Sequence, residues 1–117
     1  MTTLANKKCE SCEGKTKPLS RNEAEAIMKD VAGWQLTEDA RGLYREYSTK
    51  NFMAAVGFIN KIAAIAEGED HHPDLRLTGY RKLRIDLSTH AIGGLSENDF
   101  ILAAKINEVP VELKTDV

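Results

Sequence analysis

The chain contains three histidines, His71, His72 and His90, and all three fall in one short stretch of the sequence. Histidine is the one side chain whose ordinary pKa lies near neutrality, so it can accept and donate protons at physiological pH. Imidazole is also the commonest metal ligand in proteins. A single histidine near a helix end is usually a cap or a solvated residue, but three together predict a site for proton transfer or for a metal.

Metal binding is the rival interpretation of this cluster, because Asp70 and Asp74 lie beside His71 and His72. However, two adjacent histidines do not face one ion as two histidines four positions apart on a helix do. The sequence shows no other ligand cluster near them. The spacing therefore favours acid–base chemistry and predicts no metal site.

Cys9-x-x-Cys12 is the other candidate motif. A zinc ribbon needs a second cysteine pair, and a thioredoxin-like site needs a βαβ context, and the sequence provides neither. A zinc ion shared between subunits or with a partner, and a cysteine pair without a function in a tail, remain as alternatives.

Length and composition limit the class of protein. A chain of 117 residues fits one domain. Hydrophobic residues make up 42% of it, yet no apolar run approaches the roughly 20 residues that cross a bilayer, so we expect no membrane association. The N-terminus lacks a secretory signal and there are only two cysteines, which predicts a cytoplasmic location. The net charge of -2 comes from interleaved charges, so we expect no direct binding of nucleic acid.

The helices and strands that must position the histidines follow a polar N-terminal segment. Residues 1–18 are rich in lysine and end in Lys17-Pro18, so we interpret them as a flexible N-terminal extension carrying the Cys-x-x-Cys motif. Residues 19–117 form a single domain. Residues 20–23, Ser-Arg-Asn-Glu, have capping-box spacing and predict a helix that reaches Val31 and stops at Gly33.

Two short segments, 34–36 and 43–47, then predict a hairpin. Residues 51–66 predict a long helix, and Phe58 and Ile65 form a second apolar line off its main stripe, which suggests contact with another subunit. The main stripe consists of Phe52, Ala55, Val56, Ile59, Ile62, Ala63 and Ala66.

Residues 75–77 and 83–88 predict two more strands, and the second alternates apolar and polar residues. Ser96 to Asp99 is a second helix-start signal, and Pro110 ends that helix. The order is helix, two strands, helix, two strands, helix. This order predicts an α+β fold in which a small antiparallel sheet carries helices on one face.

The three histidines fall at the edges of these elements. Pro73 disfavours helical geometry at His72, so the pair should lie in a turn after the long helix. His90 follows a strand and precedes Gly93-Gly94, a backbone that can turn sharply or let a ligand approach. The histidines meet if the helix end and the strand end lie on the same side of the molecule.

One combination of residues is specific: Glu67-x-x-x-His71-His72-Pro73, then Tyr80, His90 and Gly94-Leu95-Ser96-x-x-Asp99. It resembles the pterin-4a-carbinolamine dehydratase family, also known as the dimerization cofactor of a homeodomain transcription factor, over about residues 19–109. The resemblance implies an α+β domain with a four-stranded antiparallel sheet, helices on one face, and a homodimer or homotetramer.

The resemblance also implies a reaction: dehydration of 4a-hydroxytetrahydropterin to quinonoid dihydropterin in tetrahydropterin recycling, with no metal or organic cofactor. His71 and His90 would be the proton-transfer pair, and His72 would orient the pterin substrate. Asp99 would also support an imidazole. The substrate-binding set that the resemblance implies is Glu67, Asp70, Ser88, Thr89 and Asp99.

Two features depart from the usual family pattern. Six residues separate Pro73 from Tyr80, one more than usual, and Leu75 stands where an aromatic residue is common. The Cys9-x-x-Cys12 extension resembles a branch in which some members act as Rubisco assembly factors. A catalytically inactive binding protein is therefore the second hypothesis, and the complete set of histidines with Asp99 favours the enzyme.

Overall fold

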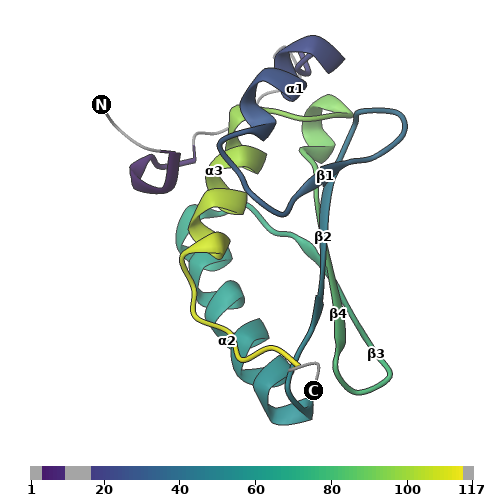
Figure 1. Cartoon of the computed structure of the whole chain (residues 1–117). Coiled ribbons are helices and arrows are strands. Elements are labelled where there is room, and N and C mark those ends of the chain that lie inside the picture. Colours follow the sequence, from purple (N-terminus) through teal and green to yellow (C-terminus); the bar gives the residue numbers. More distant parts are fainter. Residues whose placement is uncertain (1–3, 10–16, 115–117) are drawn as a thin grey trace.

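The computed structural model describes residues 4–9 and 17–114. The chain folds as an α+β domain around a four-stranded antiparallel sheet with the strand order β1-β2-β4-β3, and α2 and α3 lie on the same side of that sheet (Figure 1). The predicted fold class and order of elements are confirmed. The elements are η1 (Leu4–Asn6), α1 (Arg21–Met28), β1 (Gln35–Leu36), β2 (Leu43–Ser48), α2 (Phe52–Glu69), β3 (Asp74–Thr78), β4 (Lys82–Leu87), η2 (His90–Ile92) and α3 (Glu97–Asn107).

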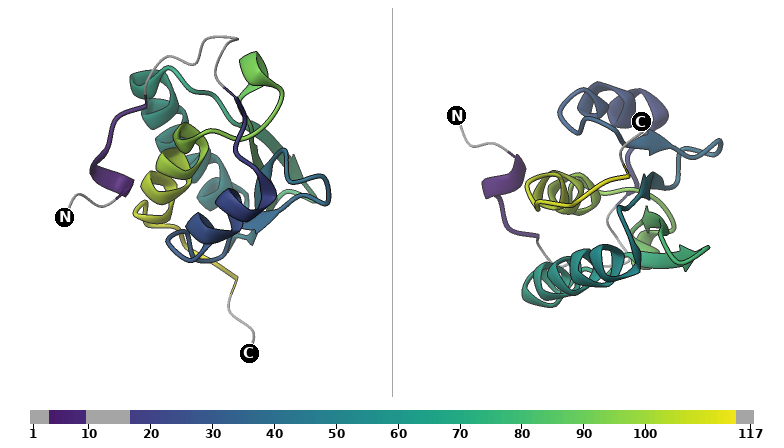
Figure 2. Two further views of the ribbon diagram at one scale, coloured as in Figure 1. Left: turned by 90° about the horizontal axis from the view of Figure 1, so that it is seen from above. Right: turned by 60° about the horizontal axis from the view of Figure 1, so that its bottom comes forward.

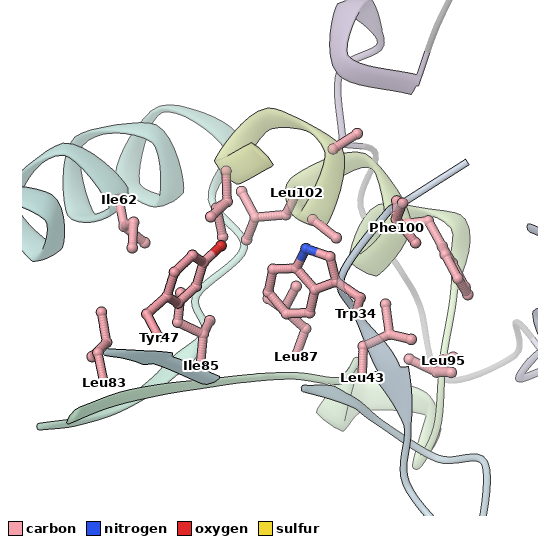
Figure 3. Close-up of a cluster of buried hydrophobic side chains, with 14 of the residues drawn as sticks. Trp34, Leu43, Tyr47, Ile62, Leu83, Ile85, Leu87, Leu95, Phe100 and Leu102 are labelled. Atoms are coloured by element: carbon pink, nitrogen blue, oxygen red, sulfur yellow. The ribbon is translucent and has the colours of Figure 1, made fainter. Parts of the chain in front are cut away.

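The sheet buries one face, and β4 shows why. Leu83, Ile85 and Leu87 are at most 1% exposed, whereas the residues that alternate with them are exposed or half-buried. This period of two gives each strand an apolar face toward the helices. The buried side chains include Trp34, Tyr47, Ile62, Phe100 and Leu102, which fill the space between sheet and helices (Figure 3).

Helix α2 is longer than predicted, and its buried face agrees only in part with the predicted stripe. Ala55, Ile62 and Ala66 are buried as expected. The helix runs to Glu69 and ends at Asp70, which takes a left-handed conformation with φ 50°. Phe58 is 2% exposed and packs edge-to-face on Tyr47 with ring centroids 5.0 Å apart, so the expectation that Phe58 contacts another subunit is wrong. Phe52, assigned to the buried stripe, is 50% exposed.

The physical reason is the helical phase. The fully buried residues of α2 recur three and four positions apart, which matches one stripe of a helix of 3.6 residues per turn. The packing against the sheet and α3 buries Phe58 and leaves Phe52 exposed, while the other three buried residues are ones that the sequence predicted. The buried stripe is Ala55, Phe58, Ile62 and Ala66.

Helix α1 begins as predicted and ends early. The Ser20 hydroxyl accepts the Glu23 N–H at 3.1 Å and the Glu23 carboxylate accepts the Ser20 N–H at 2.9 Å, which is the predicted capping box. The helix ends at Met28, because the amides of Asp30 and Val31 bond to carbonyls three residues earlier, in tighter turns. Val31 is buried in those turns rather than in the helix.

Helix α3 is the most enclosed helix of the described chain, and it contacts the start of the sequence. The Lys105 ammonium donates to the Ala5 carbonyl at 2.8 Å, and η1 lies beside α3 in Figures 1 and 2. Residues 4–9 of the predicted flexible extension are thus placed against the domain, and a domain boundary at residue 18 stays a prediction. Among the described residues, no helix is long and apolar enough to span a membrane.

Candidate active site

A pocket of about 400 Å³ lies where the C-terminal end of α2, the end of β4 and the start of α3 meet. These elements can be followed in Figure 1. All three histidines line it, so the helix end and the strand end do lie on one side of the molecule. The lining residues are Cys9, Glu69, Asp70, His71, His72, Ser88, Thr89, His90, Ala91 and Asn98.

His71 is held by a buried carboxylate. Its Nε2 lies 2.6 Å from Oδ1 of Asp99, and the two side chains are 12% and 0% exposed. Oδ2 of Asp99 accepts the Thr89 hydroxyl at 2.8 Å and the Ser96 N–H at 3.0 Å. Because these donors surround a carboxylate acceptor, His71 donates its Nε2–H, and the neutral ring then has its lone pair on Nδ1.

The start of α3 explains why Asp99 is there. Asp99 is the third residue of the helix, and its bond to the Ser96 amide is the predicted capping interaction. A carboxylate is favoured at this end of a helix by the helix dipole. The same Asp99 carboxylate therefore caps α3 and orients His71. Since it has no exposed surface, any role in binding a substrate acts through His71.

His72 is oriented by a different carboxylate. Its Nε2 lies 2.6 Å from Oε1 of Glu67, one turn back on α2. Both side chains are open to solvent, 54% and 77% exposed, so the contact fixes direction more than it stabilises the fold. Glu67 is not among the lining residues, and it reaches the pocket only through His72.

His90 begins the short helix η2, directly after Ser88 and Thr89. Reciprocal backbone bonds between Thr89 and Gly94 close this loop, and Gly93 takes a left-handed conformation with φ 67°. A Cβ at Gly94 would lie 2.7 Å from a Pro18 carbon. The two glycines therefore allow a sharp turn and close packing, and they do not line the histidine pocket.

The six residues between Pro73 and Tyr80 form β3 and the start of the loop that follows it. Residues 79–81 form the β3–β4 loop, at the far end of the hairpin from the histidines (Figure 1). Tyr80 is 57% exposed and has φ 56°. With six residues between Pro73 and Tyr80, His71 and His72 still share a pocket with His90. Leu75 packs against the hydrophobic core.

Sequence reasoning missed four lining residues: Cys9, Glu69, Ala91 and Asn98. The Cys9 N–H donates to Oε1 of Glu69 at 2.7 Å across a separation of 60 residues, and no local pattern predicts such a contact. Burial, together with the nearby Glu69 carboxylate, raises the pKa of the Cys9 thiol to about 12, so the thiol is protonated at neutral pH.

The zinc alternative concerns the same cysteine. Within residues 4–9 and 17–114, no three histidine, cysteine, aspartate or glutamate side chains are grouped so that they could hold a metal ion. Cys12, the other half of the Cys-x-x-Cys motif, lies outside the described residues.

Comparison with known proteins shows which family has a similar sequence. The family model described as pterin 4 alpha carbinolamine dehydratase matches residues 17–109. Pterin-4-alpha-carbinolamine dehydratase 2, mitochondrial, of Arabidopsis thaliana is 45% identical over 96% of this chain, which spans 62% of that protein's length. A relative from Halorhodospira halophila that carries the same family name is 45% identical, over 90% of this chain and 95% of its own.

Two solved structures are also similar. The transcriptional coactivator/pterin dehydratase from Brucella melitensis has a TM-score of 0.72 and 31% identity, and the match covers 78% of this chain and 96% of that one. A pterin dehydratase-like protein described as a RuBisCO assembly factor in the alpha-carboxysome has a TM-score of 0.55 and 20% identity, over 64% and 86% of the two chains, and shares the fold. With the family model covering residues 17–109, this chain belongs to the pterin 4 alpha carbinolamine dehydratase family.

Proposed function

We propose that this chain dehydrates a 4a-hydroxytetrahydropterin to quinonoid dihydropterin and water, by histidine acid–base catalysis. The observation that carries the proposal is the pocket lined by all three histidines, in which His71 is hydrogen-bonded to the buried Asp99 carboxylate. Membership of the family, and relatives named for this activity, support it.

The reaction needs one acid and one base. The bond between C4a and the hydroxyl oxygen breaks, the oxygen takes a proton and leaves as water, and the proton on N5 is removed as the C=N bond forms. The electrons of the N–H bond become the new π bond, so nothing is oxidised or reduced overall. The chemistry therefore requires no redox cofactor, and positioned imidazoles near neutral pH suit both proton transfers.

His71 is suited to be the base. With Nε2–H donated to Asp99, the lone pair on Nδ1 is available to accept the proton of the pterin N5. The ring becomes an imidazolium as it does so, and the buried carboxylate stabilises that positive charge. The Thr89 and Ser96 donors keep the carboxylate in place during the transfer.

His90 is then the acid that protonates the leaving hydroxyl. It is exposed, so it can regain its proton from solvent between turnovers. His72, directed by Glu67, orients the substrate, and Asp70 lies beside it on the pocket wall. The backbone of Ser88 and Thr89 meets the polar edge of the pterin.

A binding protein without catalysis, such as a Rubisco assembly factor, is the alternative. The similarity to the structure described as such a factor is at 20% identity and concerns the fold. A scaffold has no need for an imidazole backed by a buried carboxylate, and this arrangement favours the enzyme. A cytoplasmic location stays a prediction, since the name of the Arabidopsis relative places that protein in mitochondria.

The direct test is an assay of the purified chain with 4a-hydroxytetrahydropterin generated by an aromatic amino-acid hydroxylase. We expect the absorbance of quinonoid dihydropterin to appear faster than in buffer, with a rate that saturates with substrate. The double variant His71→Ala/His90→Ala, checked for an unchanged fold, is the control for the spontaneous reaction. A folded wild-type protein that does not exceed this control would reject the enzyme in favour of the binding protein.

A further inference from the structure

The segment Leu4–Cys9, called here the N-terminal segment, lies outside the matched residues 17–109 and yet reaches the candidate active site. Its last residue, Cys9, lines the histidine pocket. The N-terminal segment runs along α3, as Figure 2 shows for η1. A part of the chain that the family model does not cover thus contributes to the pocket wall.

One end of the N-terminal segment is fixed at the last turn of α3, whereas the pocket adjoins the first turn of that helix. Leu4 and Ala5 pack against the hydrophobic core, and the Lys105 ammonium donates to the Ala5 carbonyl at 2.8 Å. A hydrogen bond from a charged donor is stronger than one between neutral groups. The Lys7–Glu97 pair at 3.4 Å lies on the surface and adds little. Lys105 is therefore the principal polar anchor.

The other end is fixed inside the pocket. The Cys9 N–H donates to Oε1 of Glu69 at 2.7 Å, and the Cys9 thiol donates to the Asn98 carbonyl at 3.6 Å. Glu69 is the last residue of α2, where the helix dipole disfavours a negative charge, and the Cys9 amide offsets this cost. The N-terminal segment thereby joins the end of α2 to the start of α3.

These two helix ends carry His71, the proposed base, and Asp99, which orients it. His71 follows α2 by two residues and Asp99 lies in the first turn of α3. Cys9 and Glu69 form the side of the pocket between them. The Cys9 thiol is protonated and too weak an acid to replace an imidazole, so this side offers a neutral thiol and a fixed carboxylate for contact with a bound molecule.

We propose that the N-terminal segment is a substrate-positioning wall of the pocket: through Cys9 and Glu69 it contributes binding of the pterin and takes no part in proton transfer. This inference rests on the proposed function, because it assumes that a pterin occupies the pocket. Loosening the segment should weaken binding of substrate and transition state alike, which raises KM and leaves kcat unchanged.

The first experiment measures access to the Cys9 thiol in the full chain. Cys12→Ser leaves Cys9 as the only cysteine of the sequence. The rate of alkylation by a maleimide is measured with and without saturating biopterin, whose binding is followed separately by calorimetry. We expect bound biopterin to slow alkylation several-fold. Biopterin that binds without changing the rate overturns the inference alone, and biopterin that fails to bind counts against the proposed function as well.

The second experiment loosens the N-terminal segment from a distance. Lys105→Met keeps the aliphatic stem and removes the donor to the Ala5 carbonyl, and Lys61→Met, on the exposed face of α2, is the matched control. We expect Lys105→Met to speed Cys9 alkylation and to raise KM about three- to tenfold, the equivalent of one net hydrogen bond, with kcat within about twofold.

The outcomes of that comparison are distinct. Faster alkylation with an unchanged KM would show that the segment is detached without consequence for the substrate, and would overturn the inference. Alkylation at the wild-type rate would contradict the anchoring through Lys105. A fall in kcat at unchanged KM would place the segment in the chemistry rather than in binding. Lys61→Met should match the wild type in alkylation, KM and kcat.

Discussion

The Asp99 carboxylate is the residue on which the geometry of the pocket depends. Fully buried, it accepts hydrogen bonds from His71, Thr89 and Ser96, and so ties the turn after α2, the end of β4 and the start of α3 to one point. Each partner comes from a different element. The same contacts that cap α3 also fix the tautomer of His71.

Asp99→Asn should lower kcat about 10- to 100-fold, the usual cost of losing a partner that orients a functional imidazole. The amide cannot stabilise the imidazolium, and its NH₂ group faces donors where an acceptor is needed. Steady-state kinetics measure the effect, with Asp30→Asn on the exposed surface as the control. A full wild-type kcat in a folded Asp99→Asn protein would remove Asp99 from the account.

Only some of the residues of the site could be predicted from the sequence. His71, His72, His90 and Asp99 could be selected because their types and spacing suggest chemistry. The contact between Cys9 and Glu69 could not be selected, because it joins positions 60 residues apart through a backbone amide, which every residue type offers. Glutamate at the end of a helix otherwise looks like a solvated residue.

The histidines lie at the ends of helices and strands, so the point at which each element ends decides where they are placed. Helix α2 begins with the Asn51 side chain accepting the Ala54 N–H at 2.8 Å and ends with Asp70 in the left-handed conformation, after which the histidine pair follows. The left-handed residue turns the chain out of the helix one residue before His71. The sequence predicted that the helix ends before the histidine pair, but it placed the last helical residue at 66 rather than at Glu69.

Asn51→Ala should lower the free energy of unfolding by about 1 kcal/mol, because it leaves the first turn of α2 without its cap. Thermal or urea unfolding measures the loss, and activity at low temperature should stay at the wild-type level because the cap lies at the opposite end of α2 from the pocket. Asn60→Ala, in the exposed middle of the same helix, should change stability far less. Equal losses in the two variants would contradict the capping role.

Helix α1 gives a pH-dependent prediction. The hydrogen bond that the Ser20 backbone N–H donates to the Glu23 carboxylate, with a smaller contribution from the Ser20 side chain, lowers the pKa of Glu23 below its usual value. A lowered pKa in the folded state means that the contribution to stability is present above the unfolded pKa, about 4.3, and is lost as the pH falls through the folded pKa. Melting temperatures of wild type and Glu23→Gln should therefore differ at neutral pH and converge in acid. Glu25→Gln is the control, and a difference that persists in acid would contradict this account.

The overall fold could be predicted because the apolar residues of its strands and helices recur with clear periods. β4 alternates strictly, and the two capping signals mark the starts of α1 and α3. The buried face of α2 could be predicted at Ala55, Ile62 and Ala66. Which phenylalanine joins it could not be predicted, since Phe52 and Phe58 are equally apolar and the packing against Tyr47 buries the second. The docking of residues 4–9 on α3 depends on Lys105, which in the sequence resembles any surface lysine.

The homodimer or homotetramer that the family resemblance implies stays a prediction. Phe58 does not contribute to such an interface because its side chain lies in the core, while Phe52 and Met53 at the start of α2 are 50% and 72% exposed. Sedimentation velocity should give the mass of two or four chains at micromolar concentration. A single species with the mass of one chain would contradict the prediction and would leave these apolar side chains in water.

The proposed dehydration depends on the proton-transfer pair His71 and His90, and the dehydration rates of His71→Ala and His90→Ala test this most directly. Each variant, shown by its melting temperature to be folded, should dehydrate 4a-hydroxytetrahydropterin about 10²- to 10⁴-fold more slowly than the wild type, because each lacks one of the two groups that move protons. Wild-type rates in both variants would contradict the assignment.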